Sequence, residues 1–246
     1  MITSLEELSL NAWPALQTLL YDGWVLRFAN GYTKRANSIN PLYARCSSLD
    51  IDQKLDFCES VFRSQKLPVV FKITPTIFPS NLDEILQARG YRKDSLTSVQ
   101  ILEMSPANIQ SPSAVEIRED LSDEWLDGYC RMSAVSAVNR ETQQRMLMNI
   151  LPRHCYAAFK IDDRQIACGL GVLQSGYIGL FDIVTDEAFR GRGFGQQVIS
   201  AILAWGQQYG ADNAYLQVML NNSPALRLYS KIGFIEQYQY WYRIKA

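Results

Sequence analysis

The hexapeptide RGRGFG, residues 190–195, runs without a break into the apolar stretch QQVISAILAW, residues 196–205. Three of its six positions are glycine, a residue that costs about 0.5–1 kcal/mol relative to alanine inside regular structure. A mere connection between two elements does not require this composition. The stretch therefore predicts a glycine loop at the start of an amphipathic helix, at a point where something has to approach a bare backbone.

The beginning of such a helix suits an anion. The first turn of a helix has N–H groups without intrahelical partners, and the helix dipole places partial positive charge there. The predicted strand LFDIVT, residues 180–185, leads into the loop. Backbone amides from Gly191 to Gln196 can surround a phosphate or pyrophosphate, and Arg190 and Arg192 can add charge-assisted hydrogen bonds. The sequence thus predicts a phosphate-binding loop.

Other phosphate-binding loops and nucleic-acid motifs fit this stretch poorly. The dinucleotide fingerprint needs glycine at position 196, where Gln196 stands, and a P-loop needs a Gly-Lys-Ser/Thr sequence that is absent. An RGG-type nucleic-acid segment is repetitive and basic, whereas this is one copy in a chain of net charge -1 and pI near 5.9. A plain helix start after a glycine turn remains the alternative.

Two motifs together resemble the GNAT superfamily of acyl-CoA N-acyltransferases. The pyrophosphate motif of that superfamily, Gln/Arg-x-x-Gly-x-Gly/Ala, is matched by Arg190, Gly193 and Gly195. A second family motif, Asn-x-x-Ala-x-x-Leu-Tyr-x-x-x-Gly-Phe, is matched by Asn222, Ala225, Leu228, Tyr229, Gly233 and Phe234. The resemblance covers residues 115–246, with the expected strand order between the motifs.

The resemblance implies an α/β (α+β) fold with a mixed, mostly antiparallel sheet flanked by helices. It also implies an N-acetyltransferase that moves an acetyl group from acetyl-CoA to a primary amine by direct attack. Ile183, Val184 and Thr185 would lend backbone groups to the pantetheine arm, and Asn222 would bind the cofactor arm. The residues implied at the pyrophosphate are Arg190, Gly191, Arg192, Gly193, Phe194, Gly195 and Gln196.

The reaction needs an acid and a base. A primary amine with a pKa near ~10 is mostly protonated at neutral pH, so a proton must leave before attack. The resemblance places Tyr229 at the sulfur, where its hydroxyl would protonate the departing thiolate, and N–H groups around Val184 would hold the thioester oxygen. Binding alone has little need for an acid there. A non-catalytic acyl-CoA-binding sensor is therefore the second hypothesis.

The base is less clear from the sequence. Some family members carry a glutamate on the strand before the asparagine motif, and Gln217 stands there instead. Asp182 is the candidate base, acting through water, although side-chain alternation along a strand can turn it away from the cleft. Asp186 and Glu187 are interpreted as a solvated turn. The acceptor is a small-molecule or peptide amine, because kinship of fold does not choose between amines.

The stretch SPANIQSPSA, residues 105–114, reads as a linker between a lobe at 1–104 and the GNAT domain at 115–246. Both parts end on a strand, a short helix, a Gly-aromatic pair and a last strand, at residues 69–104 and 214–245. The matching tetrapeptides are ARGY, residues 88–91, and KIGF, residues 231–234. We expect the smaller first lobe to be a degenerate GNAT-like copy; two unrelated lobes are the alternative. It has CSSLDIDQ, residues 46–53, in place of the glycine loop and is expected to bind no CoA.

The first lobe could instead help to enclose the acceptor. Polar and aromatic side chains crowd around turn residues in DGWVLRFANGYTKRANS, residues 22–38, and could line a pocket. The residues in question are Trp24, Tyr32, Lys34, Arg35 and Asn37. An ordinary edge strand with solvated lysine and arginine side chains is an equally good interpretation.

The cysteines and the termini bear on location and metals. Five widely spaced cysteines without a C-x-x-C pair suit reduced thiols in a cytosol, and a single histidine, His154, argues against a metal site. The N-terminus lacks the apolar core of a signal peptide, and no apolar run reaches the ~20 residues of a membrane span. We expect a cytoplasmic protein that uses neither a membrane nor nucleic acid; the oligomeric state is not indicated.

Overall fold

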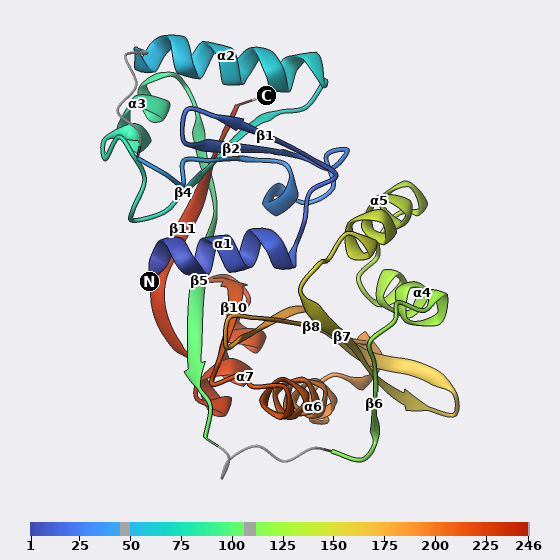
Figure 1. Ribbon diagram of the computed structural model, residues 1–246. Helices are drawn as coiled ribbons and strands as arrows, with labels where there is room; N and C mark the ends of the chain where they lie inside the picture. Colours follow the sequence, from blue (N-terminus) through green and yellow to red (C-terminus); the bar gives the residue numbers. More distant parts are fainter. Residues whose placement is uncertain (45–49, 106–111, 246) are drawn as a thin grey trace. The chain divides into compact units, whose positions relative to one another are not determined.

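The computed structural model describes residues 1–44, 50–105 and 112–245, and the chain forms two compact units (Figure 1). Unit 1 contains residues 1–98 and 238–246, and unit 2 contains residues 99–237. The predicted linker at 105–114 falls largely on residues 106–111, which lie outside the described residues. The expected domain bounds at 104 and 115 therefore stay a prediction.

Unit 1 is a sheet covered by helices. Its elements are α1 (Ile2–Ala12), β1 (Gln17–Tyr21), β2 (Trp24–Phe28), β3 (Ile39–Asn40), α2 (Ile51–Ser64), β4 (Val69–Ile73), α3 (Leu82–Ala88), and parts of β5 (Arg92–Glu103) and β11 (Ile235–Lys245). The strand order is β1-β2-β3-β4-β11-β5. β1 to β3 are antiparallel, β3 and β4 are parallel, and β4 and β11 are antiparallel.

Two segments of unit 1 show how local residues shape the chain. Leu5, Leu8 and Ala12 form the buried stripe of α1. The stretch YTKRANSINP, residues 32–41, has the composition of a strand bounded by turn residues, but it forms a 3-10 turn before the two-residue β3. The reason is local, because the Asn37 side chain hydrogen-bonds to backbone groups from Ala29 to Thr33 and curls the chain.

Unit 2 contains the expected GNAT-like elements. They are β6 (Val115–Arg118), α4 (Asp123–Met132), α5 (Ala137–Met148), β7 (Arg153–Ile161), β8 (Arg164–Gln174), β9 (Tyr177–Thr185), the 3-10 turn η3 (Glu187–Phe189), α6 (Phe194–Gln208), β10 (Asn213–Met219) and α7 (Ser223–Ile232). The strand order is β5-β10-β9-β8-β7-β6. β6 to β9 are antiparallel, and β9 and β10 are parallel. The predicted mixed, mostly antiparallel sheet is confirmed.

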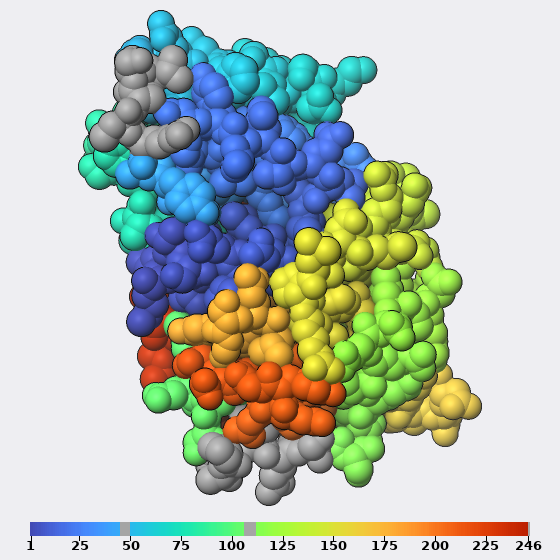
Figure 2. Space-filling model, in the orientation of Figure 1, coloured from blue at the N-terminus to red at the C-terminus, as the bar shows by residue number. Residues whose placement is uncertain are grey.

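Helices cover both faces of the unit 2 sheet. α6 lies close against β8 on one face: a Cβ on Gly171 would collide with the Ile202 side chain of α6, and one on Gly169 would come within 3.0 Å of it. α4 lies on the other face, where the Trp125 indole N–H donates to the carbonyl of Ala157 in β7 at 3.0 Å. α5 lies beside α4, as Figures 1 and 2 show. The two faces of the sheet therefore meet different helices.

The same order of elements occurs twice in the chain. Along residues 17–103 and again along residues 153–245, three antiparallel strands are followed by a helix, a strand parallel to the third, a second helix and a last strand. The internal duplication expected from ARGY and KIGF would produce this order, and it stays a prediction. The last strands are divided: residues 238–245 of β11 belong to unit 1, and residues 99–103 of β5 belong to unit 2.

Candidate active site

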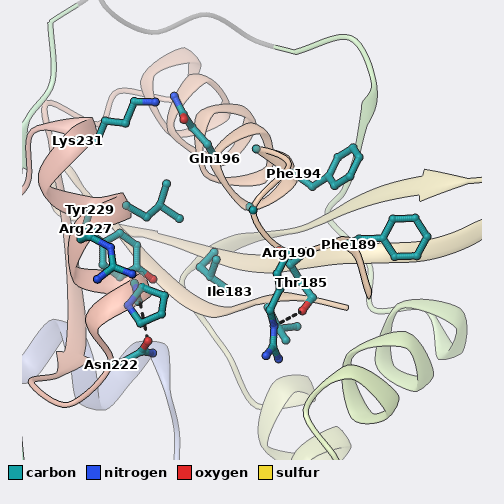
Figure 3. A pocket seen from close by; sticks show the side chains of 17 residues that line it. Ile183, Thr185, Phe189, Arg190, Phe194, Gln196, Asn222, Arg227, Tyr229 and Lys231 are labelled. Atoms are coloured by element: carbon teal, nitrogen blue, oxygen red, sulfur yellow. Dashed lines mark hydrogen bonds between the residues drawn. The ribbon is translucent and has the colours of Figure 1, made fainter. Parts of the chain in front are cut away.

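A cavity of about 660 Å³ lies in unit 2 between the end of β9, the glycine loop, the first turn of α6 and α7 (Figure 3). The predicted site residues that line it are Ile183, Val184, Thr185, Arg190, Gly191, Gly193, Phe194, Gly195, Gln196, Asn222 and Tyr229. Two predicted residues, Arg192 and Asp182, do not line it. The structure thus brings both motifs, which are about 30 positions apart, to one cavity.

The cavity begins where β9 and β10 stop pairing. Their parallel register runs from Asn213↔Tyr177 to Leu216↔Leu180, whereas β9 continues to Thr185. On its other side β9 stays paired with β8, through Val184↔Cys168 and Thr185↔Ala167. One edge of the backbone from 183 to 185 therefore borders the cavity instead of a strand, so its N–H and C=O groups can bind a ligand.

The glycine loop has a backbone that favours glycine. Gly191 and Gly193 have φ angles of +77° and +84°, in the left-handed region. A side chain at either position would meet no atom within 4 Å, so the requirement is one of conformation rather than of space. Gly195 differs, because a Cβ there would lie 3.2 Å from the Thr185 hydroxyl, which is closer than an ordinary contact.

The first turn of α6 presents amides to the cavity. Gly193 is the N-cap residue, and the N–H of Gln197 is the first to bond to its carbonyl, at 3.1 Å. The preceding N–H groups, from 194 to 196, have no carbonyl four residues earlier within the helix. Arg190 donates to the carbonyl of Thr185 at 3.3 Å and ties the loop to β9 (Figure 3). The arrangement matches the predicted anion site.

The Arg192 guanidinium lies outside this cavity. It lies 5.4 Å from the centroid of the Phe189 ring, in cation–π geometry. Arg190 therefore remains the arginine of the loop that borders the cavity.

α7 positions the second motif. The Asn222 side chain caps the helix by accepting the N–H of Ala225 at 3.3 Å, and Gly233, with φ at +109°, ends it. Tyr229, which is 8% exposed, packs its ring against Phe234 at 5.8 Å between centroids. Asn222 and Gly233 therefore fix the beginning and the end of the helix that carries Tyr229.

Two basic residues of the cavity were missed by sequence reasoning. Arg227 and Lys231 stand four positions apart on α7, on the face that lines the cavity (Figure 3). Their positions in the sequence could have indicated them. Arg227 and Lys231 lie on either side of Tyr229 within the second motif, and side chains four positions apart share one face of a helix. They add positive charge opposite the first turn of α6.

Asp182 lies on the other face of the sheet. The β8–β9 register shifts between Cys168 and Leu170, and Asp182 takes a left-handed φ of +51° at this bulge. Its carboxylate accepts the side-chain N–H of Gln143 in α5 at 3.0 Å. The concern that alternation would turn Asp182 from the cofactor cleft is therefore confirmed: its neighbour Ile183 faces α6, and Asp182 faces α5.

The groups around Asp182 stay protonated. Burial, and then the Asp182 charge, raise the pKa of the Tyr156 hydroxyl on β7 and that of the Cys168 thiol on β8. Burial likewise raises the pKa of the Cys130 thiol on α4, with a smaller contribution from Asp182. At neutral pH these three groups can donate but carry no charge.

The interpretation of Asp186 as part of a solvated turn is wrong. Asp186 is 9% exposed, and its carboxylate accepts Arg131 at 2.6 Å, Arg164 at 2.9 Å and the N–H of Ala188 at 3.2 Å. These contacts, with Arg131 first, hold the pKa of the carboxyl below its usual value. Asp186 thus caps η3 and fixes the chain just before the glycine loop.

Replacing Asp186 with asparagine is expected to lower the urea midpoint at pH 7 and to weaken ligand binding by the loop. A carboxylate with a lowered pKa stabilises the fold above its unfolded pKa of ~3.9, and this contribution disappears as the pH falls through the folded value. The difference in urea midpoint between wild type and Asp186→Asn should therefore become smaller below about pH 4. Urea titrations from pH 7 to pH 3 measure it, with Asp163→Asn as the exposed control. A gap that stays constant would contradict the assignment.

The aromatic and basic cluster expected to help enclose an acceptor is mostly used inside unit 1. Trp24 is fully buried and donates to the carbonyl of Phe78, and Asn37 is buried against the backbone. Lys34 pairs with Asp94 at 3.1 Å, and Arg35 lies over the ring of Trp13. Tyr32 is buried as well. These contacts show that the side chains of the stretch stabilise the fold of unit 1. A role in enclosing the acceptor stays a prediction.

The described residues contain no group of three or more His, Cys, Asp or Glu side chains that could hold a metal ion. The single histidine, His154, has its Nδ1 2.8 Å from the carbonyl oxygen of Pro152. This contact joins the ring to the backbone of its own chain segment.

Comparison with solved structures places the fold. A GCN5-related N-acetyltransferase from Kribbella flavida superposes with a TM-score of 0.71 at 14% identity, covering 99% of this chain and 95% of that one. A tandem GNAT protein from the clavulanic acid biosynthesis pathway gives 0.67 at 10% identity, covering 98% and 86%. Together with the cavity and its two motifs, this fold defines a GNAT-type N-acetyltransferase.

Sequence comparison identifies the family. Residues 1–243 match the family model described as "Probable histone acetyltransferase Rv0428c C-terminal". The chain is also 32% identical over 250 residues to "Uncharacterized N-acetyltransferase YobR" of Bacillus subtilis (strain 168), covering 99% of this chain and 98% of the relative. The chain therefore belongs to the Rv0428c C-terminal family of acetyltransferases.

Proposed function

We propose that this protein transfers an acetyl group from acetyl-CoA to a primary amine, with the cofactor in the unit 2 cavity. The observation that carries the proposal is the meeting of three features in one cavity: the first turn of α6, the unpaired edge of β9 and Tyr229. Bound acetyl-CoA supplies an activated acetyl thioester. Family membership alone would not say where the thioester lies.

The residues present fit this cofactor. A pyrophosphate carries negative charge, and a helix N-terminus with Arg190, Arg227 and Lys231 around it supplies amides and cations. The volume, about 660 Å³, lies within the range of small-molecule sites. Asn222 has its side-chain oxygen engaged at Ala225, so its NH₂ group would contact the cofactor arm.

The chain's own groups would perform three tasks. N–H groups at the free edge of β9, around Val184, hold the thioester oxygen as negative charge develops. Asp182 removes a proton from the amine through water, the nitrogen–carbon bond forms and the carbon–sulfur bond breaks. Tyr229 then gives its hydroxyl proton to the departing sulfur. Two protons leave the nitrogen in all, one from the ammonium before attack and one from the acylated nitrogen after it. One of them replaces the proton that Tyr229 gave to the sulfur, and the other is released to solvent.

The direction of the Asp182 side chain supports it as the base. Consecutive residues of a strand face opposite sides of the sheet, and here Asp182 faces α5 while Ile183 faces α6. An amine that approaches from the α4/α5 face would reach the carboxylate first, while the cofactor lies along the opposite side. Asp182 is therefore a base for the acceptor side rather than a cofactor ligand.

The acceptor is proposed only as a small-molecule or peptide amine. The matched family is described as a probable histone acetyltransferase, and a 55-residue segment is 41% identical to an N-alpha-acetyltransferase of Sulfurisphaera tokodaii, covering 22% of this chain and 33% of the relative. Both names point to protein amines. Screening histone tails, N-terminal peptides, polyamines and amino acids by CoA release tests this choice.

An acyl-CoA-binding sensor without turnover is the alternative. Tyr229 favours an enzyme, because its hydroxyl lies on the cavity wall, where binding alone would be served equally well by phenylalanine. A chain that binds acetyl-CoA and releases no CoA with any amine in the screen would support the sensor.

We also propose a cytoplasmic location. The described cysteines, Cys58, Cys130, Cys155 and Cys168, are all free and buried, as in a reducing compartment. Across the part of the chain that the structure describes, no helix has both the length and the apolar character to cross a membrane. Fractionation of the source cells tests the location.

The binding site is tested by Gly193→Val. Acetyl-CoA at 100 times its Kd is expected to stabilise wild type by roughly 2.7 kcal/mol. A β-branched residue is strained at a φ of +84° and would turn the amides of the α6 first turn away from the phosphates, so most of the ligand-induced rise in Tm should disappear. Thermal melts with and without acetyl-CoA measure this.

Gly210→Val is the matched control. Gly210 has a φ of +90° and open space around its Cβ position, but it follows the other end of α6 and does not line the cavity. Both variants should lose similar intrinsic stability, and only Gly193→Val should lose the acetyl-CoA shift. An undiminished shift in folded Gly193→Val would refute the assignment of the loop.

A further inference from the structure

We propose that Gln143 of α5 is a positioning residue for the reaction, because it fixes the Asp182 carboxylate in the direction of the acceptor amine. This inference rests on the proposed function, in which Asp182 takes the proton of the amine. It adds a residue from a different element, 39 positions away in the sequence, that neither family motif contains.

Gln143 is an unusual residue for its place in the fold. It is 0% exposed on a helix whose other buried positions include Met146 and Leu147. A buried amide must find partners, since leaving it unbonded costs free energy. Its NH₂ group donates to Asp182 Oδ2 at 3.0 Å, and its Oε1 lies 3.8 Å from the Cys130 sulfur, which can donate. Both ends of the amide are therefore used.

The two contacts define the orientation of the amide. An ionised carboxylate can only accept hydrogen bonds, so the NH₂ end must face Asp182. The thiol of Cys130 has a raised pKa because it is buried, so it stays protonated and donates to the oxygen end. Cys130 on α4 thus orients Gln143, and Gln143 orients Asp182.

The contact lies at an irregular point of the sheet. Asp182 has a left-handed φ of +51°, next to the shift in the β8–β9 register between Cys168 and Leu170. With Oδ2 bonded from α5, rotation of the carboxylate is restricted. Its oxygens then keep a constant direction relative to the edge of β9 at 183–185, along which the thioester is proposed to lie. A misplacement of ~1 Å at this point can cost about 10²-fold in rate.

The test compares Gln143→Leu with Gln144→Leu. The first variant keeps the approximate volume and removes both hydrogen bonds; the second makes the same change at the next, half-buried residue, whose amide oxygen accepts from Arg140 instead. With the acceptor found in the screen, Gln143→Leu should lower kcat about 10- to 100-fold and leave the KM for acetyl-CoA unchanged. Gln144→Leu should leave both constants near those of wild type.

A second readout does not depend on turnover. Carbon-13 labelling of aspartate gives a carboxyl signal for Asp182, assigned by its absence in Asp182→Asn. Loss of a donor to a carboxylate disfavours its ionised form, so the midpoint of this signal should rise by about one pH unit or more in Gln143→Leu. The side chains that face Asp182 from α4, β7 and β8 are Cys130, Tyr156 and Cys168, all with raised pKa values, so they do not titrate in the same range.

The orienting role of Cys130 gives a graded control. Cys130→Ser keeps a donor to Gln143 and should behave like wild type, whereas Cys130→Ala should show a weaker form of the Gln143→Leu effect. Gln143→Glu places a second carboxylate against Asp182 and should raise the titration midpoint further.

Failure of the inference can be told apart from failure of the proposed function. If Asp182→Asn abolishes turnover while Gln143→Leu changes neither kcat nor the titration midpoint, the positioning role is overturned. If Asp182→Asn retains full turnover, Asp182 is not the base and the proposed function fails at that step. A rise in the midpoint together with a loss of kcat supports the inference.

Discussion

Replacing Tyr229 with phenylalanine is expected to lower kcat by about 10²- to 10⁴-fold, the usual contribution of a general acid. The ring would still pack against Phe234 and close the cavity wall, so the Kd for acetyl-CoA should change little. Only the proton supplied to the sulfur would be lost. Single-turnover kinetics with the identified acceptor and calorimetry with acetyl-CoA measure the two quantities separately.

Tyr177→Phe serves as the control for this variant. Tyr177 lies at the start of β9, its ring contacts Tyr215, and it is not among the residues that line the cavity. Its substitution should leave turnover near that of wild type. Near-normal chemistry in Tyr229→Phe would mean that the sulfur takes its proton from another group or from solvent.

Replacing Lys72 with methionine is expected to destabilise unit 1 by about 3–5 kcal/mol, the cost of leaving one charge of a buried pair without its partner. Lys72 is 4% exposed and pairs with Glu6, which is 1% exposed, at 2.5 Å. Tyr238 also donates to Glu6, at 2.6 Å. Without Lys72 the buried Glu6 carboxylate loses the cation in direct contact with it and keeps the hydrogen bond from Tyr238.

Urea unfolding followed by a probe in unit 1 measures this loss. The double variant Glu6→Gln/Lys72→Met removes both charges and should recover most of the stability, because a buried pair replaced by neutral groups costs little. Cofactor binding in unit 2 should persist in both variants at low urea. A single variant as stable as wild type would show that the pair is hydrated and contributes little.

The geometry of the proposed cofactor site was largely predictable from the sequence. Positive φ angles at Gly191 and Gly193, the helix start at 194 and the cap at Asn222 depend on residues that are neighbours in the chain. Glycine readily adopts positive φ angles and asparagine readily caps helices, and both preferences depend little on the rest of the sequence. Arg227 and Lys231 could have been added by the same reasoning about helix faces.

The proposed acceptor side was not predictable in the same way. Asp182 was a candidate, but its partner Gln143, 39 positions away, had no local signal. Asp186 was misassigned because its burial depends on Arg131, 55 positions earlier. An aspartate followed by glutamate and a turn has the composition of a solvated loop, and only the position of α4 buries it.

By itself the sequence determined the glycine loop, the tyrosine helix and the order of strands and helices from β7 to α7, because these follow from backbone preferences and periodicity within a few residues. Only the tertiary structure decided which unit the ends of β5 and β11 complete, which sheet face receives Asp182, and which side chains hold Asp182 and Asp186. Those outcomes depend on pairs of residues tens of positions apart. The interactions between these residues form only when the sheet and the helices pack together, so no local sequence pattern predicts them.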